Sequence, residues 1–332
     1  MKKNRKIKDF LAEKNNSKFM FTPGTASITE ENIKGLGPCF GRGDDEYLNT
    51  EDRVLKKLKK ITGHKNIVRM QGSGSFALEV LSLNFLYGKV LIVSTGHYSD
   101  RLYNLCTSAK KNFRKIMKVS KVDWKNIEDF SGRFDWVFAC PTETSCGLRI
   151  PIQDLKKLSK KIKSKLALDA TASIGLEMNH DLADVISYSS CKGLFGLTGG
   201  CFIAYNSNPE NKVNSFNLDI NSHIQKKMTG PYHAIQSLEK ILYNHSFYKH
   251  SVQINKTSFL KKFENKLIYE KKNQPLLCTY AKCKLGAKDK RVIFYKARNN
   301  LSGSVVCHLG EVSLGRKAKA DILKKIYVKK EI

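Results

Sequence analysis

Asp169 and Lys192 are the residues whose positions first suggest chemistry. Asp169 ends an apolar run, Leu166-Ala-Leu, and a second run, Asp184–Ser190, leads to Cys191 and Lys192. Both runs predict strands, and α/β proteins bind ligands at the carboxyl ends of parallel strands. A pyridoxal 5′-phosphate (PLP) site needs such a pair, because a lysine forms a Schiff base with the cofactor and an acid keeps its pyridine nitrogen protonated. Taken alone, the pair could also be a solvated lysine and a helix-capping aspartate.

A Gly/Ser-rich turn at Gly72–Ser75 supplies a candidate phosphate site. It lies between a predicted strand and a predicted helix, so backbone N–H groups, hydroxyls and a helix N-terminus come together there. A turn of this composition is more often only a tight turn. It lies upstream of Asp169 and Lys192 at another strand end, however, and so supplies the third part that a PLP site requires.

Four motifs, in order along the chain, resemble those of the class V aminotransferases, a family of fold-type I PLP enzymes. They are Gly72-Ser-Gly-Ser-Phe-Ala-Leu-Glu, Gly96-His-Tyr-Ser-Asp-Arg, Glu143-Thr-Ser-Cys-Gly and Ser190-Cys-Lys. In the second motif, Ser99 stands where the family has glycine. The similarity extends from Phe21 to Leu309 and is greater to the 2-aminoethylphosphonate–pyruvate transaminases than to the alanine–glyoxylate aminotransferases. Each motif is weak alone, but their order, with Asp169 in its place, is specific.

The resemblance implies a role for each matching residue. Lys192 would form the Schiff base and move the proton during catalysis, and Asp169 would bind the pyridinium nitrogen. Thr229 would reach the phosphate of a partner subunit, which implies a homodimer with shared active sites. The cofactor-binding residues expected from the family are Ser73, Gly74, Ser75 (phosphate), Tyr98 (ring face), Thr144 (O3′), Asp169, Thr171 (ring orientation), Ser190, Lys192 and Thr229.

The substrate end of the site departs from the family. Relatives bind the acid group of the substrate with an arginine, and Val305 stands at that position here. The loss of this arginine removes a bidentate, charge-assisted contact to a carboxylate or phosphonate. The candidate replacements are Arg42, Arg298, His308 and Arg316.

The resemblance implies a PLP-dependent aminotransferase that moves an amino group from a small primary amine, 2-aminoethylphosphonate first of all, to pyruvate or a similar 2-oxo acid. One alternative is another class V enzyme, an alanine/serine–glyoxylate-type transaminase or a lyase, with an altered substrate pocket. A desulfurase is disfavoured because Cys191 replaces the histidine expected before the lysine. The other alternative is a non-catalytic basic binding protein on a PLP fold, which the presence of both Lys192 and Asp169 disfavours.

Helix and strand patterns alternate through the first half of the chain. Helices are predicted over Glu51–Ile61, Ser75–Leu86, Tyr98–Ala109 and Ile152–Lys163, and strands over Asn66–Gln71, Val90–Ser94, Trp136–Ala139 and Leu166–Leu168. This alternation indicates a mostly parallel sheet that is covered on both faces. With the resemblance, it predicts an α/β, fold-type I protein: a large domain with a mostly parallel, seven-stranded sheet between helices, and a small α+β C-terminal domain. The expected boundaries are a basic arm over 1–15, the PLP-binding domain over 16–250 with a loop-rich start over 16–48, and the small domain over 251–332.

The net charge of +29 comes mainly from lysines on predicted amphipathic helices such as Leu155–Lys163. Since no RNA-binding aromatic spacing or helix-turn-helix pattern is found, the expected partners are a small amine and a 2-oxo acid, not nucleic acid. The nine cysteines show no zinc-like spacing, so we expect no metal site. We expect the cysteines to be free thiols. With no bilayer-length apolar run and no signal-peptide pattern, we expect a cytoplasmic protein without membrane contact.

Overall fold

The computed structural model describes residues 6–38, 43–298, 300–310, 312 and 316–329. A seven-stranded sheet has the order β2, β10, β9, β8, β5, β3, β4. In that order the strands are Asn66–Gln71, Gly200–Tyr205, Val185–Ser189, Lys165–Asp169, Trp136–Ala139, Gly88–Ser94 and Ile116–Asp123. Strand β10 runs antiparallel to both neighbours, and the other neighbouring pairs are parallel. The predicted mostly parallel sheet is confirmed.

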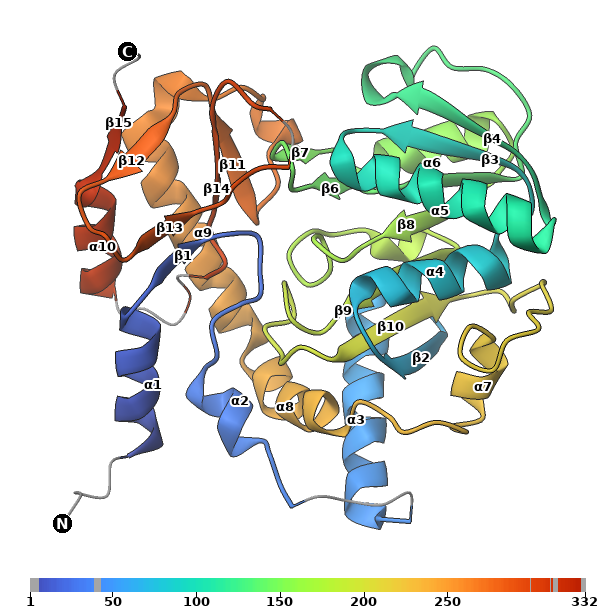
Figure 1. Ribbon diagram of the computed structural model, residues 1–332, viewed down its shortest axis with the longest axis horizontal. Coiled ribbons are helices and arrows are strands. Elements are labelled where there is room, and N and C mark those ends of the chain that lie inside the picture. The colour runs from blue at the N-terminus through green and yellow to red at the C-terminus, as the bar shows by residue number, and fades with distance from the viewer. Residues whose placement is uncertain (1–5, 39–42, 299, 311, 313–315, 330–332) are drawn as a thin grey trace.

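Both faces of this sheet are covered by helices, which is why a central strand such as β5 is a continuous apolar run. In β3, Leu91 and Val93 pack on one side while Val90 and Ile92 pack on the other. The first side holds α3 (Asp45–Thr62), α6 (Ile152–Lys161) and α8 (Tyr232–Tyr243), and the second holds α4 (Gly74–Phe85) and α5 (His97–Phe113). Figure 1 shows α4 and α5 in front of the sheet.

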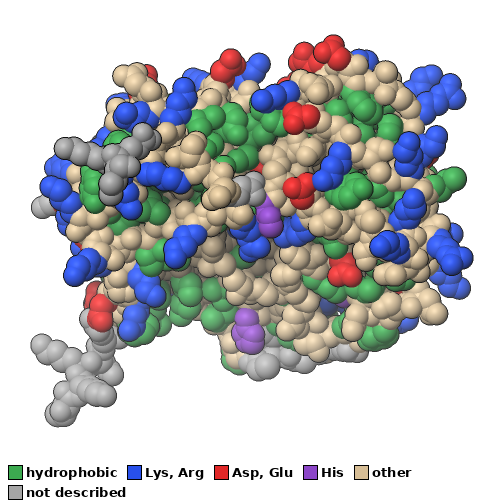
Figure 2. Space-filling view, turned by 45° about the horizontal axis from the view of Figure 1, so that its top comes forward, with side chains coloured by type: hydrophobic (Ala, Val, Ile, Leu, Met, Phe, Trp, Pro, Cys, Tyr) green, Lys and Arg blue, Asp and Glu red, His purple; other side chains and the backbone are tan. Residues whose placement is uncertain are grey.

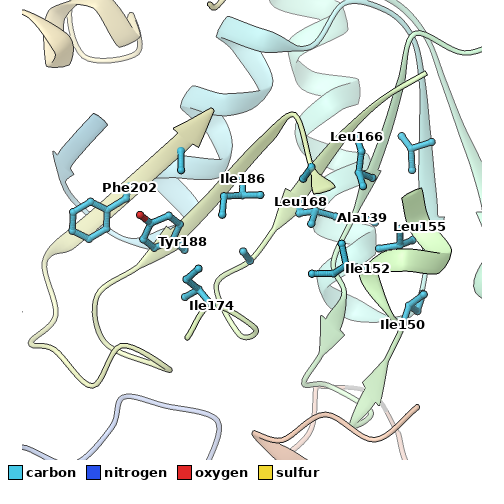
Figure 3. Packing of buried hydrophobic residues seen from close by; sticks show 14 of the residues in the cluster. Ala139, Ile150, Ile152, Leu155, Leu166, Leu168, Ile174, Ile186, Tyr188 and Phe202 are labelled. Atoms are coloured by element: carbon cyan, nitrogen blue, oxygen red, sulfur yellow. The ribbon is translucent and has the colours of Figure 1, made fainter. Parts of the chain in front are cut away.

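The core beneath α6 illustrates this packing (Figure 3). Leu166 and Leu168 of β8 lie near Ile152 and Leu155 of α6, and all four side chains are almost fully buried. Burying one such side chain contributes about 1.5–3 kcal/mol relative to leaving it exposed. The layer therefore fixes the strand ends that carry the site.

The C-terminal part is a smaller α+β unit, as predicted. It contains α9 (His245–Phe263), β11 (Cys278–Ala281), β12 (Leu285–Ala287), β13 (Val292–Phe294), β14 (Ser304–Cys307), α10 (Arg316–Lys325) and β15 (Ile326–Val328). Antiparallel pairs form between β11 and β14 and between β12 and β15. Strand β1 (Phe19–Phe21), from the predicted large domain, pairs in parallel with β13. The predicted boundary at residue 251 falls within α9, and the domain limits stay a prediction.

The remaining α-helices and strands are short. They are α1 (Ile7–Asn16), α2 (Glu30–Lys34), α7 (Ile220–Ile224), β6 (Thr142–Glu143) and β7 (Leu148–Arg149). Helix α1 occupies most of the segment 1–15 that was expected to be a basic arm. Asp9 in its first turn and Lys14 in its last turn suit the helix dipole.

Lysines and arginines are spread over the whole face shown in Figure 2, with few acidic side chains between them. They do not gather in a single stripe on that face. Within the described parts of the chain, no helix has the length and apolar character needed to cross a bilayer.

Candidate active site

A cavity of about 400 Å³ lies at the carboxyl edge of the large sheet. Segments that follow β2, β3, β5, β8 and β9 form its wall, together with Arg298 from the C-terminal part. The residues that line it are Gly72, Ser73, Gly74, Ser75, Tyr98, Arg101, Cys140, Thr142, Thr144, Asp169, Thr171, Ala172, Ser189, Cys191, Lys192, Thr198, Gly199, Gly200 and Arg298. The cavity thus brings together eight of the predicted cofactor-binding residues, all except Ser190 and Thr229.

The turn Gly72–Ser75 begins α4 at this edge. Ser73 caps the helix, since its Oγ accepts a hydrogen bond from the Phe76 N–H at 3.2 Å. Gly74 approaches Thr171 so closely that a Cβ would lie 3.0 Å from the threonine Oγ1. A helix N-terminus with two serine hydroxyls beside it favours a bound phosphate.

Asp169 lies at the end of β8 with 3% of its surface exposed. Its Oδ1 accepts a hydrogen bond from the Thr171 N–H at 3.0 Å, and its Oδ2 lies 3.1 Å from Nη2 of Arg101. Nη1 of Arg101 donates to Oγ of Ser75 at 2.9 Å, and its guanidinium carbon lies 4.9 Å from the Tyr98 ring centroid. Arg101 therefore links the acid, the phosphate turn and the aromatic ring. Arg101 ends the Gly96–Arg101 motif but was not among the residues predicted for the site.

Glu143 fixes the start of α5, and with it Tyr98 and Arg101. The buried carboxylate accepts hydrogen bonds at Oε2 from the N–H groups of Tyr98 (3.0 Å) and Ser99 (3.2 Å). Its Oε1 accepts from the N–H (3.1 Å) and Oγ (2.5 Å) of Ser145. A carboxylate here satisfies helix N–H groups and offsets the positive end of the dipole. The motif Glu143–Gly147 marked this segment as part of the site in the sequence, but it did not indicate what the glutamate does.

Lys192 follows β9 in a loop that returns to β10. Its Nζ lies 5.8 Å from the Tyr98 ring centroid, so amine and ring border the same space. Ser190 lies behind the loop, where its buried hydroxyl donates to the carbonyls of Leu197 and Gly200. In this structure Ser190 holds the lysine loop closed, and direct contact with a cofactor stays a prediction.

Three threonine hydroxyls in the cavity wall are buried without a hydrogen-bond partner in the described structure, those of Thr142, Thr144 and Thr171. Buried polar atoms are nearly always paired, and an unpaired one costs about 1–3 kcal/mol. A ligand with several polar atoms would satisfy them. Thr144 and Thr171 are two residues expected to contact PLP, so the cavity fits that cofactor.

Cys140 is the most enclosed thiol of the cavity. Burial raises its pKa well above the ordinary value, and the nearby carboxylates of Asp169 and Glu143 raise it further. The thiol is therefore neutral at physiological pH and a poor nucleophile. This leaves no role for Cys140 as the reactive cysteine of a desulfurase.

The candidate substitutes for the missing arginine lie in different places. Arg298 lines the cavity, with Nη1 3.5 Å from Nε2 of His97. His308 does not reach it: the ring is buried, Nε2 lies 3.0 Å from Oγ1 of Thr279, and burial lowers its pKa to about 3. Val305 is buried in β14, and Arg42 lies outside the described residues.

Thr229 lies apart from Lys192 of its own chain. It lines a separate cavity of about 400 Å³ with Gln71, the residue before the phosphate turn, and Phe76 of α4. It therefore lies beside the outer surface of the phosphate turn.

Curated relatives agree with the resemblance. No protein-family model matches the chain. A bifunctional phosphonoacetaldehyde hydrolase/aminoethylphosphonate transaminase of Clostridioides difficile is 25% identical over 260 residues, which cover 70% of this chain and 41% of that protein. A 2-aminoethylphosphonate–pyruvate transaminase of Pseudomonas aeruginosa is 24% identical over 247 residues, covering 67% of each. The chain thus spans less than half of the first relative and about two thirds of the second.

Solved aminotransferase structures match over nearly the whole chain. The alanine–glyoxylate aminotransferase of Nostoc sp. covers 92% of this chain and 93% of its own, with a TM-score of 0.77 at 19% identity. The PLP-bound phosphoserine aminotransferase of Trichomonas vaginalis covers 93% of this chain and 99% of its own, with a TM-score of 0.73 at 13% identity. The chain has their fold. The predicted fold class is confirmed.

Proposed function

We propose that this protein is a PLP-dependent aminotransferase that transfers an amino group from 2-aminoethylphosphonate or a similar small amine to pyruvate or a related 2-oxo acid. One observation carries the proposal. Lys192, Asp169 and the Gly72–Ser75 helix start line one cavity, and that cavity also presents the unpaired hydroxyls of Thr144 and Thr171. The names of the curated relatives support the reaction and the donor.

Each residue has a distinct task in this proposal. PLP supplies an aldehyde that condenses with amines and a ring that withdraws electrons. Asp169 holds a proton on the pyridine nitrogen, and Arg101 holds Asp169 through the 3.1 Å contact. The start of α4 binds the phosphate, and Tyr98 covers the ring. The Lys192 amine moves a proton at the substrate Cα as general base and acid.

Arg298 provides the positive charge for the acid group of the substrate, and His97 lies beside it. Arg298 lines the cavity and contacts His97 through Nη1, and a guanidinium can form the two parallel hydrogen bonds that carboxylates and phosphonates accept. This pair would replace the arginine that relatives have at the position of Val305.

The buried Val305 also favours a second candidate, another class V enzyme with a different amine donor. With the usual arginine absent, an acid group would have to be bound from another direction, such as that of Arg298. An alanine- or serine-dependent transaminase, or a lyase, would use the same cofactor residues.

Thr229 supports a homodimer with shared sites. Thr229 does not line the cavity that its own Lys192 lines, yet it lies beside Gln71 at the phosphate turn. A second chain across this surface would receive Thr229 at its own phosphate.

The absorption spectrum of the PLP-loaded protein tests the function. We expect a visible Schiff-base band that 2-aminoethylphosphonate bleaches and that pyruvate restores. Alanine, serine and cysteine serve as comparison amines. A different active amine would select the second candidate, and the absence of any band would reject PLP binding.

A further inference from the structure

A second and larger cavity lies between the α6 side of the sheet and the C-terminal part. Its volume is about 760 Å³, and its wall includes the end of β7, the start of α6, residues 176–179, α9 and the turn Lys271–Asn273. Sites for small organic ligands occupy about 300–1,000 Å³. The proposed transamination does not use this space.

The wall of this second cavity is strongly basic. Five cationic side chains line it: Arg149, Lys249, Lys256, Lys271 and Lys272. Among the described lining residues the one acid is Glu177, which is already paired with Nη1 of Arg149 at 2.8 Å and with the Leu276 N–H at 2.7 Å. Like charges that converge on a cleft create a potential that favours a multivalent anion.

Lys256 is the deepest of these cations. Its Nζ donates to the carbonyls of Pro275 at 2.8 Å and Gln274 at 3.2 Å, and burial lowers its pKa to about 8. A bound anion would stabilise the charged form of this amine. An anion therefore stabilises the charged form of Lys256 more than it would stabilise a fully solvated lysine.

Apolar side chains lie beside the cations. Met178, which is 73% exposed, and the half-buried Leu276 line the same wall. An inorganic anion would leave these two side chains in contact with water. A ligand that combines an apolar body with two or more negative charges matches both parts of the wall.

The two cavities share the β6–β7 hairpin. Thr142 pairs with Arg149 in its ladder. Thr142 and Thr144 line the first cavity, whereas Arg149 and Pro141 line the second. Arg149, which lines the second cavity, is therefore the ladder partner of Thr142, which lines the first.

We propose that the second cavity binds a multivalent organic anion of nucleotide size, and that the β6–β7 hairpin makes this binding and PLP binding interdependent.

Calorimetric titration of the PLP-loaded protein with adenosine triphosphate or inorganic pyrophosphate tests the site. The variant Lys249→Ala/Lys271→Ala removes two cations of the cavity. The control Lys110→Ala/Lys111→Ala removes two exposed lysines of α5 and changes the net charge equally. We expect the Kd of the triphosphate to rise by about tenfold or more in the first variant and by less than about twofold in the control. We also expect pyrophosphate to bind the wild type less tightly than the triphosphate does.

Equal losses in both variants, or no binding of the triphosphate at millimolar concentration, would overturn the site, and equal binding of pyrophosphate would overturn its organic character. For the interdependence, we expect the triphosphate to change the Kd of PLP by about fivefold or more in the wild type and not in the cavity variant. A change that persists in the variant would mean direct competition at the first cavity. These measurements do not involve amino transfer, so they fail or succeed separately from the proposed reaction.

Discussion

At the scale of single residues, Arg101 shows how few atoms define the site. Its two terminal nitrogens contact a carboxylate oxygen of Asp169 and the hydroxyl of Ser75, and its guanidinium lies over the Tyr98 ring. A lysine could not reproduce this planar, branched contact. The orientation of the acid therefore depends on a residue that does not itself perform the proposed chemistry.

Replacing Lys192 with alanine should remove the Schiff base. We expect loss of the visible band, loss of the borohydride-reducible link to PLP, and turnover lower by about 10²–10⁴-fold, because the general base is gone. Lys118→Ala, on an exposed position of β4, should leave all three unchanged. A reducible link that survives in Lys192→Ala would assign the role to another lysine.

Replacing Arg101 with alanine should weaken PLP binding by about tenfold, because Asp169 and Ser75 lose a charge-assisted contact. Fluorescence titration with PLP measures the Kd, and the exposed Arg133→Ala is the control. An unchanged Kd for Arg101→Ala would show that Asp169 keeps its orientation without the arginine.

Replacing Arg298 with alanine should raise KM for 2-aminoethylphosphonate by about tenfold or more while kcat changes little, since the lost contact is to the acid group and not to the reacting atoms. Steady-state kinetics with the acid and with an uncharged amine of similar size separate the effects. An equal loss for both amines would point to a folding defect.

At the scale of elements, the sequence predicted the features that local residue patterns determine, namely the strands and helices and the residues at their ends. Asp169, Lys192 and Gly72–Ser75 stand at ends of recognisable strands and helices, and the structure brings them together. The contacts of Glu143 and Arg101 join side chains to groups far away in the sequence, so no periodicity indicates them. His308 was expected near the substrate, but its burial beside Thr279 depends on the pairing of β11 with β14.

Glu143→Gln tests the element that holds Tyr98. The amide keeps the shape but loses the charge at the N-terminus of α5, so the free energy of unfolding should fall by about 1–3 kcal/mol. Urea unfolding measures it, and Glu128→Gln, at an exposed position, is the matched control. Equal stability of the two variants would contradict the capping role.

At the scale of the whole molecule, buried histidines should make stability depend on pH. Burial lowers the pKa values of His180 and His308 to about 3, whereas a histidine in the unfolded chain titrates near 6.5. Below about pH 6.5 the unfolded chain binds protons that the folded chain excludes. The free energy of unfolding should therefore fall by up to about 1.4 kcal/mol per pH unit for each histidine, and the effect should vanish above that pH.

Urea unfolding at pH 7.5 and pH 5.5 measures this slope. His308→Asn should flatten it by the share of one histidine, while His250→Asn, at an exposed position of α9, should not. Identical slopes for the wild type and His308→Asn would mean that His308 titrates normally in the folded protein.

The pairing of β1 with β13 has a consequence for how the chain is made. Phe19–Phe21 precedes every strand of the large sheet in the sequence, but its partner Val292–Phe294 follows all of them. During synthesis the strands of the large sheet are therefore complete before β1 can pair. Deletion of Phe19–Phe21 would remove this strand pair, and the segment that follows it also contacts the lysine loop, where the Ala26 N–H donates to the Cys191 carbonyl at 2.9 Å.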